Sequence, residues 1–262
     1  MNVLEVKNLT KVFDTKTGAF LAVQDVSFGV GENDFVSLVG PSGCGKSTII
    51  RMINGITPIT YGSIKLFGKE YAKEVKGEVI KKMGFIFQSP NLLPWLTVRK
   101  NMELPLQVFK LKDEKYQKNV DSLLEVFGLY ECQNEYPASL SGGMMQRAGV
   151  MRAMVHNPEI LLMDEPYGSL DEDMREQLDL ETLAIWKRTG TSVIFITHNI
   201  TEAVLMSKRV LVMGTDPGRL LEEIEIDLPY PRTLEMIETD QFKKYEEKII
   251  ELIGILDLAK IV

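Results

Sequence analysis

The nine residues 40–48, GPSGCGKST, restrict the possible fold of this chain more than any other stretch. They match the pattern G-x-x-x-x-G-K-[ST] and lie between an apolar run at residues 34–39 and a helical stretch that reaches about Asn54. Small residues at these positions allow the backbone N–H groups of a loop to wrap a phosphate chain. The spacing therefore predicts a phosphate-binding loop that joins a buried strand to a helix.

The residue types within this loop indicate that its ligand is a nucleoside triphosphate. We expect Lys46 to reach the outer phosphates and the Ser47 hydroxyl to bind Mg²⁺. The remaining loop residues are expected to line the nucleotide, and they are Gly40, Pro41, Ser42, Gly43, Cys44, Gly45 and Thr48. By itself the motif does not distinguish a kinase, a GTPase and an ATPase.

A second chemical feature is the acidic end of an apolar strand at residues 160–163, which is followed by Asp164 and Glu165. Ligands of α/β proteins bind at the carboxyl ends of such strands. Asp164 suits Mg²⁺, directly or through water, and Glu165 could polarise a water for attack on the γ-phosphate. The alternative is that both carboxylates only cap the strand. Because the sequence shows no acceptor pocket of a kinase, hydrolysis is favoured.

Three further residues fit the same chemistry less specifically. Gln88 ends the run FIFQ and could bring a carbonyl oxygen to Mg²⁺ and the attacking water, or it could be an ordinary polar cap. His198 follows VIFIT and could sense the γ-phosphate, although an isolated histidine after a strand often has no special role. Phe13 could stack on adenine or belong to the core.

The segment LSGG at residues 140–143 predicts a second anion-binding turn. Ser141 can cap a helix, and Gly142 and Gly143 then occupy its first turn, where each glycine costs about 1 kcal/mol relative to alanine. Such a turn exposes backbone N–H groups at the positive end of the helix dipole.

The order of the elements predicts an α/β fold. Alternating segments over the first thirty residues indicate antiparallel strands, and later strands and helices alternate as in a parallel sheet wrapped by helices. Residues 97–156 read as a helical lobe, and residues about 239–258 as an amphipathic helix after the linker LPYPR. That helix either packs on the chain's own surface or supports a dimer.

Composition limits the partners. The net charge of −7 argues against nucleic acid, two unpatterned cysteines indicate a reducing compartment, and the N-terminus lacks a signal-peptide pattern. Apolar runs are of strand length, so work at a membrane requires a partner.

In their order and spacing, these motifs resemble ATP-binding cassette (ABC) ATPases of transporters. The resemblance covers residues 2–228 and implies a P-loop NTPase (RecA-like) core with an antiparallel β subdomain and a helical subdomain inserted at about 89–157, leaving residues 229–262 as linker and C-terminal helix. It also implies ATP, Mg²⁺ and a second copy, because two cassettes of this family pack head to tail. Ser141, Gly142 and Gly143 of one subunit would then bind the γ-phosphate held by the other.

The resemblance assigns roles residue by residue. Phe13 resembles the adenine-stacking aromatic, Gln88 the glutamine that links Mg²⁺ to the membrane partner, and Glu165 the catalytic base. Asp171 resembles the interface aspartate and His198 the switch histidine. The chain departs from the family pattern at Met144, where glutamine is usual, and at Tyr167, where phenylalanine is commoner.

The stretch from Gln88 to Leu106 is the expected contact with a transmembrane permease. Leu92, Leu93, Trp95 and Leu96 either line a groove for a short permease helix or pack inward. The chain resembles the nitrate/sulfonate/taurine/bicarbonate importers in five segments taken together, GPSGCGKST, LSGGM, THNITEAVLMSKRVLVM, DPGRL and DLPYPR. This resemblance implies a peripheral subunit at the cytoplasmic face, served by a solute-binding protein. Lipoprotein-release or macrolide-export cassettes, non-transport ABC ATPases, and a module that holds ATP without hydrolysing it are the alternatives.

Overall fold

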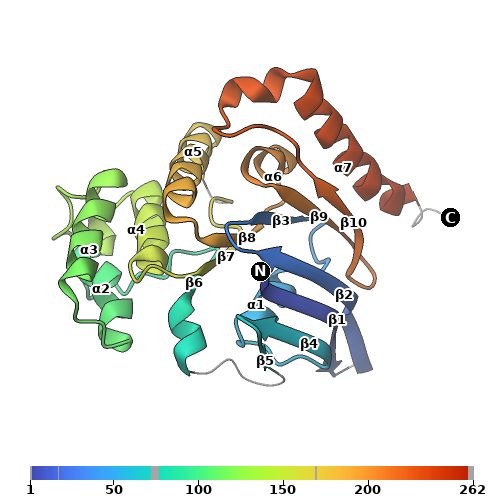
Figure 1. Cartoon of the computed structure of the whole chain (residues 1–262), viewed down its shortest axis with the longest axis horizontal. Coiled ribbons are helices and arrows are strands. Elements are labelled where there is room, and N and C mark those ends of the chain that lie inside the picture. The colour runs from blue at the N-terminus through green and yellow to red at the C-terminus, as the bar shows by residue number, and fades with distance from the viewer. Residues whose placement is uncertain (1, 17, 72–76, 169, 259–262) are drawn as a thin grey trace. The chain divides into compact units, whose positions relative to one another are not determined.

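The computed structural model describes residues 2–16, 18–71, 77–168 and 170–258 (Figure 1). The chain divides into two compact units, one formed by Met1–Val79 with Ser192–Val262 and the other by Ile80–Thr191. Within the described residues, no helix has both the length and the apolar character needed to cross a bilayer.

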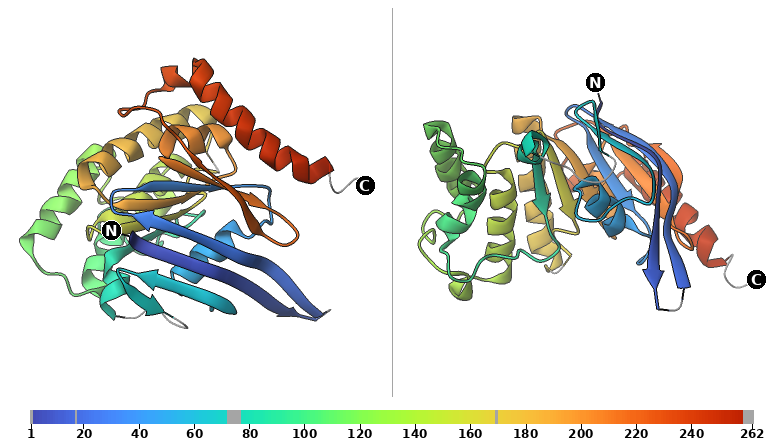
Figure 2. Two further views of the ribbon diagram at one scale, coloured as in Figure 1. Left: turned by 45° about the vertical axis from the view of Figure 1, so that its right-hand side comes forward. Right: turned by 90° about the horizontal axis from the view of Figure 1, so that it is seen from below.

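The first unit contains an antiparallel sheet with the strand order β2-β1-β4-β5. Its strands are β1 (Asn2–Thr15), β2 (Gly18–Gly31), β4 (Tyr61–Leu66) and β5 (Lys69–Tyr71). The antiparallel pair expected from the first thirty residues is confirmed as the long β1–β2 ribbon, which Figure 2 shows from two sides. The edge strand β5 was not expected, because three residues are too few to show the alternation of apolar and polar residues that indicates a strand.

The parallel part of the first unit surrounds β3 (Phe35–Val39), which pairs with β8 (Ser192–Ile196) on one side and β9 (Arg209–Gly214) on the other. Every residue of β3 and β8 is buried, as the continuous apolar runs predict for parallel strands. Strand β10 (Arg219–Glu225) adds an antiparallel edge to β9. Helix α1 (Lys46–Ile53) follows β3 along the chain, and helix α6 (Ile200–Met206) follows β8.

The C-terminal segment packs against this same unit. After the short helix η3 (Leu234–Glu238), α7 (Asp240–Leu258) runs beside α6 (Figures 1 and 2). Phe242 and Ile249 are fully buried in one apolar cluster with Val204 of α6 and Val212 of β9. The expected amphipathic helix is therefore present, and its apolar face packs on the chain's own surface.

Arg232 ties the linker before α7 to the end of α6. It is 4% exposed, and its guanidinium donates hydrogen bonds to five backbone carbonyl oxygens. Three of them, those of Val204, Leu205 and Ser207, lie at the C-terminal end of α6, where the helix dipole favours a cation.

The second unit combines a parallel strand pair with helices. Strand β6 (Met83–Ile86), preceded by η1 (Gly77–Lys82), pairs with β7 (Ile160–Asp164). The expected helical region consists of α2 (Val98–Val108), α3 (Glu114–Val126), η2 (Pro137–Ser139) and α4 (Gly142–Met154), and α5 (Glu172–Thr189) follows β7 (Figure 1). The boundaries of an inserted subdomain at 89–157 stay a prediction, since this compact unit also includes β6, β7 and α5.

Candidate functional site

The phosphate-binding loop follows β3 directly and leads into α1. Gly40 has φ 155° and Gly45 has φ 91°, and both values lie in the region that favours glycine. A Cβ atom at residue 40 would stand 2.5 Å from the carbonyl oxygen of Met213, and one at residue 45 would stand 2.7 Å from Cγ2 of Val23. Both glycines are therefore required by the backbone conformation and the local packing.

The ammonium group of Lys46 lies inside this loop. Lys46 is 5% exposed, and its Nζ donates to the carbonyl oxygens of Gly40 at 2.7 Å and Pro41 at 3.1 Å. Burial raises the pKa of the neighbouring Cys44 thiol above its ordinary value, although Lys46 opposes the change. The buried Cys44 side chain therefore favours its neutral thiol form.

Two other candidates lie in the first unit. Phe13 is 36% exposed on β1, so the alternative that it belongs to the core is wrong. The Nζ atom of Lys11 lies 4.7 Å from the centroid of its ring. His198 is exposed two residues after the end of β8, next to Asn199, whose side chain accepts from Glu202 N and caps α6.

In the second unit, β7 ends at Asp164, which is 3% exposed, and Glu165 follows it. Glu165 has φ 47°, a left-handed conformation that costs a non-glycine residue about 1–3 kcal/mol. Gln88, which follows β6 after Phe87, donates from Nε2 to Oε2 of Glu165 at 3.4 Å. The structure thus brings Gln88 and Glu165 together.

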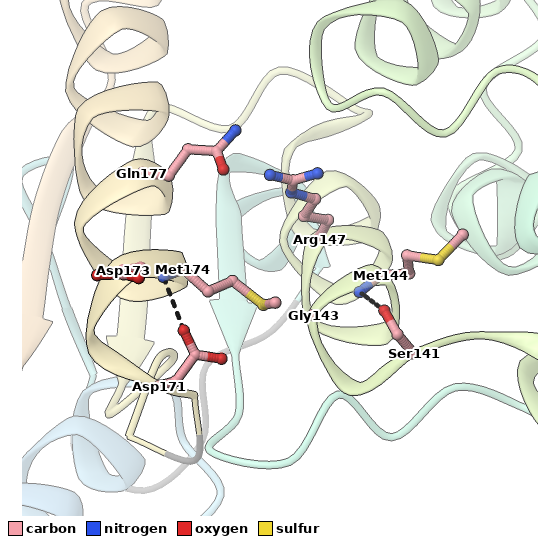
Figure 3. A pocket seen from close by; sticks show the side chains of 8 residues that line it. All are labelled: Ser141, Gly143, Met144, Arg147, Asp171, Asp173, Met174 and Gln177. Carbon is pink, nitrogen blue, oxygen red and sulfur yellow. Dashed lines mark hydrogen bonds between the residues drawn. The ribbon is translucent and has the colours of Figure 1, made fainter.

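The expected glycine-rich helix start is present. Ser141 is the N-cap of α4, and its hydroxyl accepts a hydrogen bond from Met144 N at 3.3 Å. Gly142 is exposed, and apart from its chain neighbours and the backbone of its own helix no described atom lies within 4 Å of the place a Cβ would take. Asp171 caps α5 in the same manner by accepting from Met174 N at 3.0 Å (Figure 3). Ser169, in the segment SLD, lies outside the described residues.

Two buried amides support these segments, and sequence reasoning did not select either. Gln146 of α4 is 1% exposed and donates to the carbonyl oxygen of Pro166, the residue after Glu165. Asn101 of α2 is fully buried and donates to the carbonyl oxygens of Leu93, Leu96 and Thr97. Asn101 could have been found, because it is a polar residue on the apolar stripe that contains Val98 and Met102.

The loop before α2 exposes an aromatic side chain, that of Trp95. Trp95 is 68% exposed, so the reading that it packs inward is wrong, whereas Leu92, Leu93 and Leu96 are half-buried. A cavity of about 390 Å³ lies between β6, α2 and α4. Phe87, Leu104 and Phe109 are among the residues that line it.

Comparison with known proteins decides the family. The family described as ABC transporter matches residues 23–168. The chain belongs to this family. As an ABC ATPase it binds ATP and hydrolyses it to power transport, and the expected P-loop NTPase fold is confirmed.

Relatives of this ABC ATPase include an aliphatic sulfonates import ATP-binding protein, SsuB, of Bacillus cereus, which is 36% identical over 95% of this chain and 94% of its own length. An uncharacterized ABC transporter ATP-binding protein of Methanocaldococcus jannaschii is 39% identical over 95% of this chain and 91% of its own. Among solved structures, the ATP-binding cassette MJ0796, a dimer in a post-hydrolysis state bound to ADP and Pi, is similar with a TM-score of 0.77 and 30% identity. That match covers 86% of this chain and 100% of that one.

Proposed function

We propose that this ABC ATPase acts at the cytoplasmic face of the membrane. There it drives the import of a small anion, such as a sulfonate, nitrate or taurine. The observation that carries the proposal is the match to sulfonate import cassettes over 95% of the chain. In this proposal a permease forms the membrane path, and a solute-binding protein delivers the anion. Relatives named for import favour this reading over an export cassette.

The proposed nucleotide site begins with the loop at residues 40–48. Its backbone N–H groups and Lys46 hold the phosphates, and Phe13 stacks on adenine. The oxygen donors of Ser47, Asp164 and Gln88 are of the hard type that Mg²⁺ prefers, so these residues fit that ion. When bound, Mg²⁺ would offset the negative charge of the phosphate oxygens.

Glu165 is the proposed general base. Its carboxylate accepts the proton of the attacking water, and the hydrogen bond from Gln88 restricts the direction in which that carboxylate faces. His198 is proposed to contact the γ-phosphate from the end of β8. The uncommon backbone conformation of Glu165 fits a role that depends on the exact direction of its side chain.

A second copy of the chain completes the proposed site. In a head-to-tail dimer, Ser141, Gly142 and Gly143 of one copy bind the γ-phosphate held by the other, and Asp171 lies at the same interface. Two features support this role. The open surroundings of Gly142 leave room for a ligand, and the hydroxyl of Ser141 accepts from Met144 N without using its own proton.

The permease is proposed to dock on the segment between Gln88 and Leu106. Exposed tryptophan is enriched at interface hot spots, and Trp95 is 68% exposed. Gln88 lies at one end of this segment and hydrogen-bonds Glu165, so the segment connects the docking surface to the proposed catalytic base.

The test uses a tagged Glu165→Gln variant expressed in the native host and purified from solubilised membranes with ATP present. We expect the variant to retain ATP and to lose at least about 100-fold in turnover, as general-base removal does. A multi-span permease and a solute-binding protein should co-purify, and the same preparation without ATP is the control. Wild-type turnover would remove Glu165 from the mechanism. Recovery with nucleic acid or ribosomal components, and no permease, would contradict the transport proposal.

The solute-binding protein recovered in this way identifies the cargo. Aliphatic sulfonates, taurine and nitrate are each titrated against it by calorimetry. Binding of one of these anions supports the importer reading, and binding of a sugar or peptide alone contradicts it.

A further inference from the structure

The first turns of α4 and α5 face each other across a cavity of about 330 Å³ (Figure 3). Ser141, Gly143 and Arg147 line it from the α4 side, and Asp171 and Met174 from the α5 side. The cavity therefore lies between the glycine-rich turn and the aspartate that the proposed dimer uses.

Met174 connects these two features directly. Its backbone N donates to Oδ1 of Asp171 at 3.0 Å, which closes the cap of α5. Its side chain reaches the opposite helix, where Sδ lies only 2.1 Å from the place that a Cβ of residue 143 would take. Gly143 is buried, whereas Gly142 is exposed. A Cβ at residue 143 would therefore displace the flexible end of the Met174 side chain, whereas one at residue 142 would not.

We propose that Met174 is a positioning residue that fixes the turn of Ser141–Gly143 relative to Asp171. The inference rests on the proposed function, in which the turn binds the nucleotide held by the second copy and Asp171 lies at the same interface. A thioether on an unbranched chain fills irregular space and contacts a bare helix backbone closely. Because hydrogen-bond donors to a phosphate must be placed within a fraction of an ångström, a gap beside this turn weakens binding of the partner's nucleotide.

A separate polar contact holds the same two helices together further along. Nη2 of Arg147 lies 3.3 Å from Oε1 of Glu181, and Gln177 Nε2 donates to the same oxygen at 2.9 Å. Removal of the Met174 side chain leaves this contact in place. A variant at residue 174 is therefore expected to fold, with its defect confined to the first turns.

The experiment measures ATP-dependent dimerisation by analytical ultracentrifugation, with Glu165→Gln as the parent. Met174→Ala should raise the dimer dissociation constant about tenfold or more, while binding of a fluorescent ATP analogue to the monomer stays within about twofold. Met174→Leu should restore most of the dimerisation, because leucine refills the space. Met145→Ala, a truncation of the same residue type in the first turns of α4, is the matched control and should behave as the parent.

The contact itself is tested by a double-mutant cycle on thermal unfolding. The change in Tm caused by Gly143→Ala should be more favourable when Met174→Ala is also present than in the wild type, because the added Cβ then no longer displaces Sδ. If the parent dimerises with ATP and Met174→Ala dimerises equally well, the role of Met174 is overturned and the proposed dimer stands. A parent that stays monomeric with ATP would overturn the proposed dimer and this role together.

Discussion

At the residue scale, the candidate site is supported by buried polar side chains that donate to backbone carbonyl groups. Lys46 donates to Gly40 and Pro41, Gln146 donates to Pro166, and Asn101 holds the loop before α2. Each bond fixes a loop that has no regular structure of its own. Charge-assisted or amide bonds of this kind are expensive to remove when the remaining partner stays buried.

Tyr167, which replaces the commoner phenylalanine, provides a direct test of this cost. Its hydroxyl lies 2.6 Å from Oγ1 of Thr182, and both side chains are buried. Tyr167→Phe should lower the free energy of unfolding by about 1 kcal/mol, because the Thr182 hydroxyl loses its partner. Tyr167→Phe with Thr182→Val should recover most of the loss. Urea unfolding measures the free energy of unfolding of the single and the double variant. A Tyr167→Phe variant as stable as the wild type would contradict the prediction.

A second residue predicts a dependence of stability on pH. His156 is 6% exposed, its Nε2 lies 3.1 Å from the carbonyl oxygen of Met83, and burial lowers its pKa below the ordinary value of 6.5, although the bond to Met83 opposes the shift. Among the described residues, Nδ1 finds no hydrogen-bond partner. The unfolded chain therefore takes up a proton more readily than the folded one, and stability falls as the pH drops below about 6.5.

The measurement is urea unfolding at pH 7.5 and pH 5.5 for the wild type and for His156→Gln, whose amide can still donate to Met83. The wild type should lose up to about 1 kcal/mol more than the variant over this interval, since the slope for one proton is at most about 1.4 kcal/mol per pH unit. Equal pH dependence in both proteins would show that His156 does not carry the effect.

At the element scale, burial explains which segments could be predicted from sequence. Strands β3, β7 and β8 are buried over their whole length, so they appear as continuous apolar runs. Strand β10 has the sequence RLLEEIE, with only Ile224 buried, and its pattern is hidden by three glutamates. The loop at residues 40–48 was predictable because its glycine spacing is local. The contact of Gly143 with Met174 was not, because only the fold brings these residues together.

The attachment of the C-terminal segment also belongs to this scale. Arg232→Met should lower the free energy of unfolding by about 2–4 kcal/mol, because five carbonyl oxygens, three of them at the end of α6, lose their buried donor. Arg219→Met, a change at an exposed position of β10, is the control and should stay within about 0.5 kcal/mol of the wild type. Equal stability of the two variants in urea unfolding would contradict the assigned role of Arg232.

At the scale of the whole molecule, the question is how a chain with no described bilayer-spanning helix meets a permease. Trp95→Ala should reduce the permease recovered by pull-down about tenfold, with binding of a fluorescent ATP analogue unchanged. Tyr61→Ala is the matched control, because Tyr61 is also 68% exposed but lies on β4 of the other unit. Equal loss of permease in both variants would show that Trp95 is not a specific contact.

The division of the chain into units has a consequence for biosynthesis. Strand β3, which leads into the phosphate-binding loop, pairs only with β8 and β9 among the described strands of its unit, and β9 is made about 170 residues after it. At a translation rate of about 5–20 residues per second, β3 waits roughly 10–35 s for its second neighbour. The second unit is continuous along the chain and leaves the ribosome during this interval. On the ribosome, the helices of the second unit can therefore fold while the proposed nucleotide loop still lacks its sheet, and β3 gains both of its neighbours only after β9 has been made.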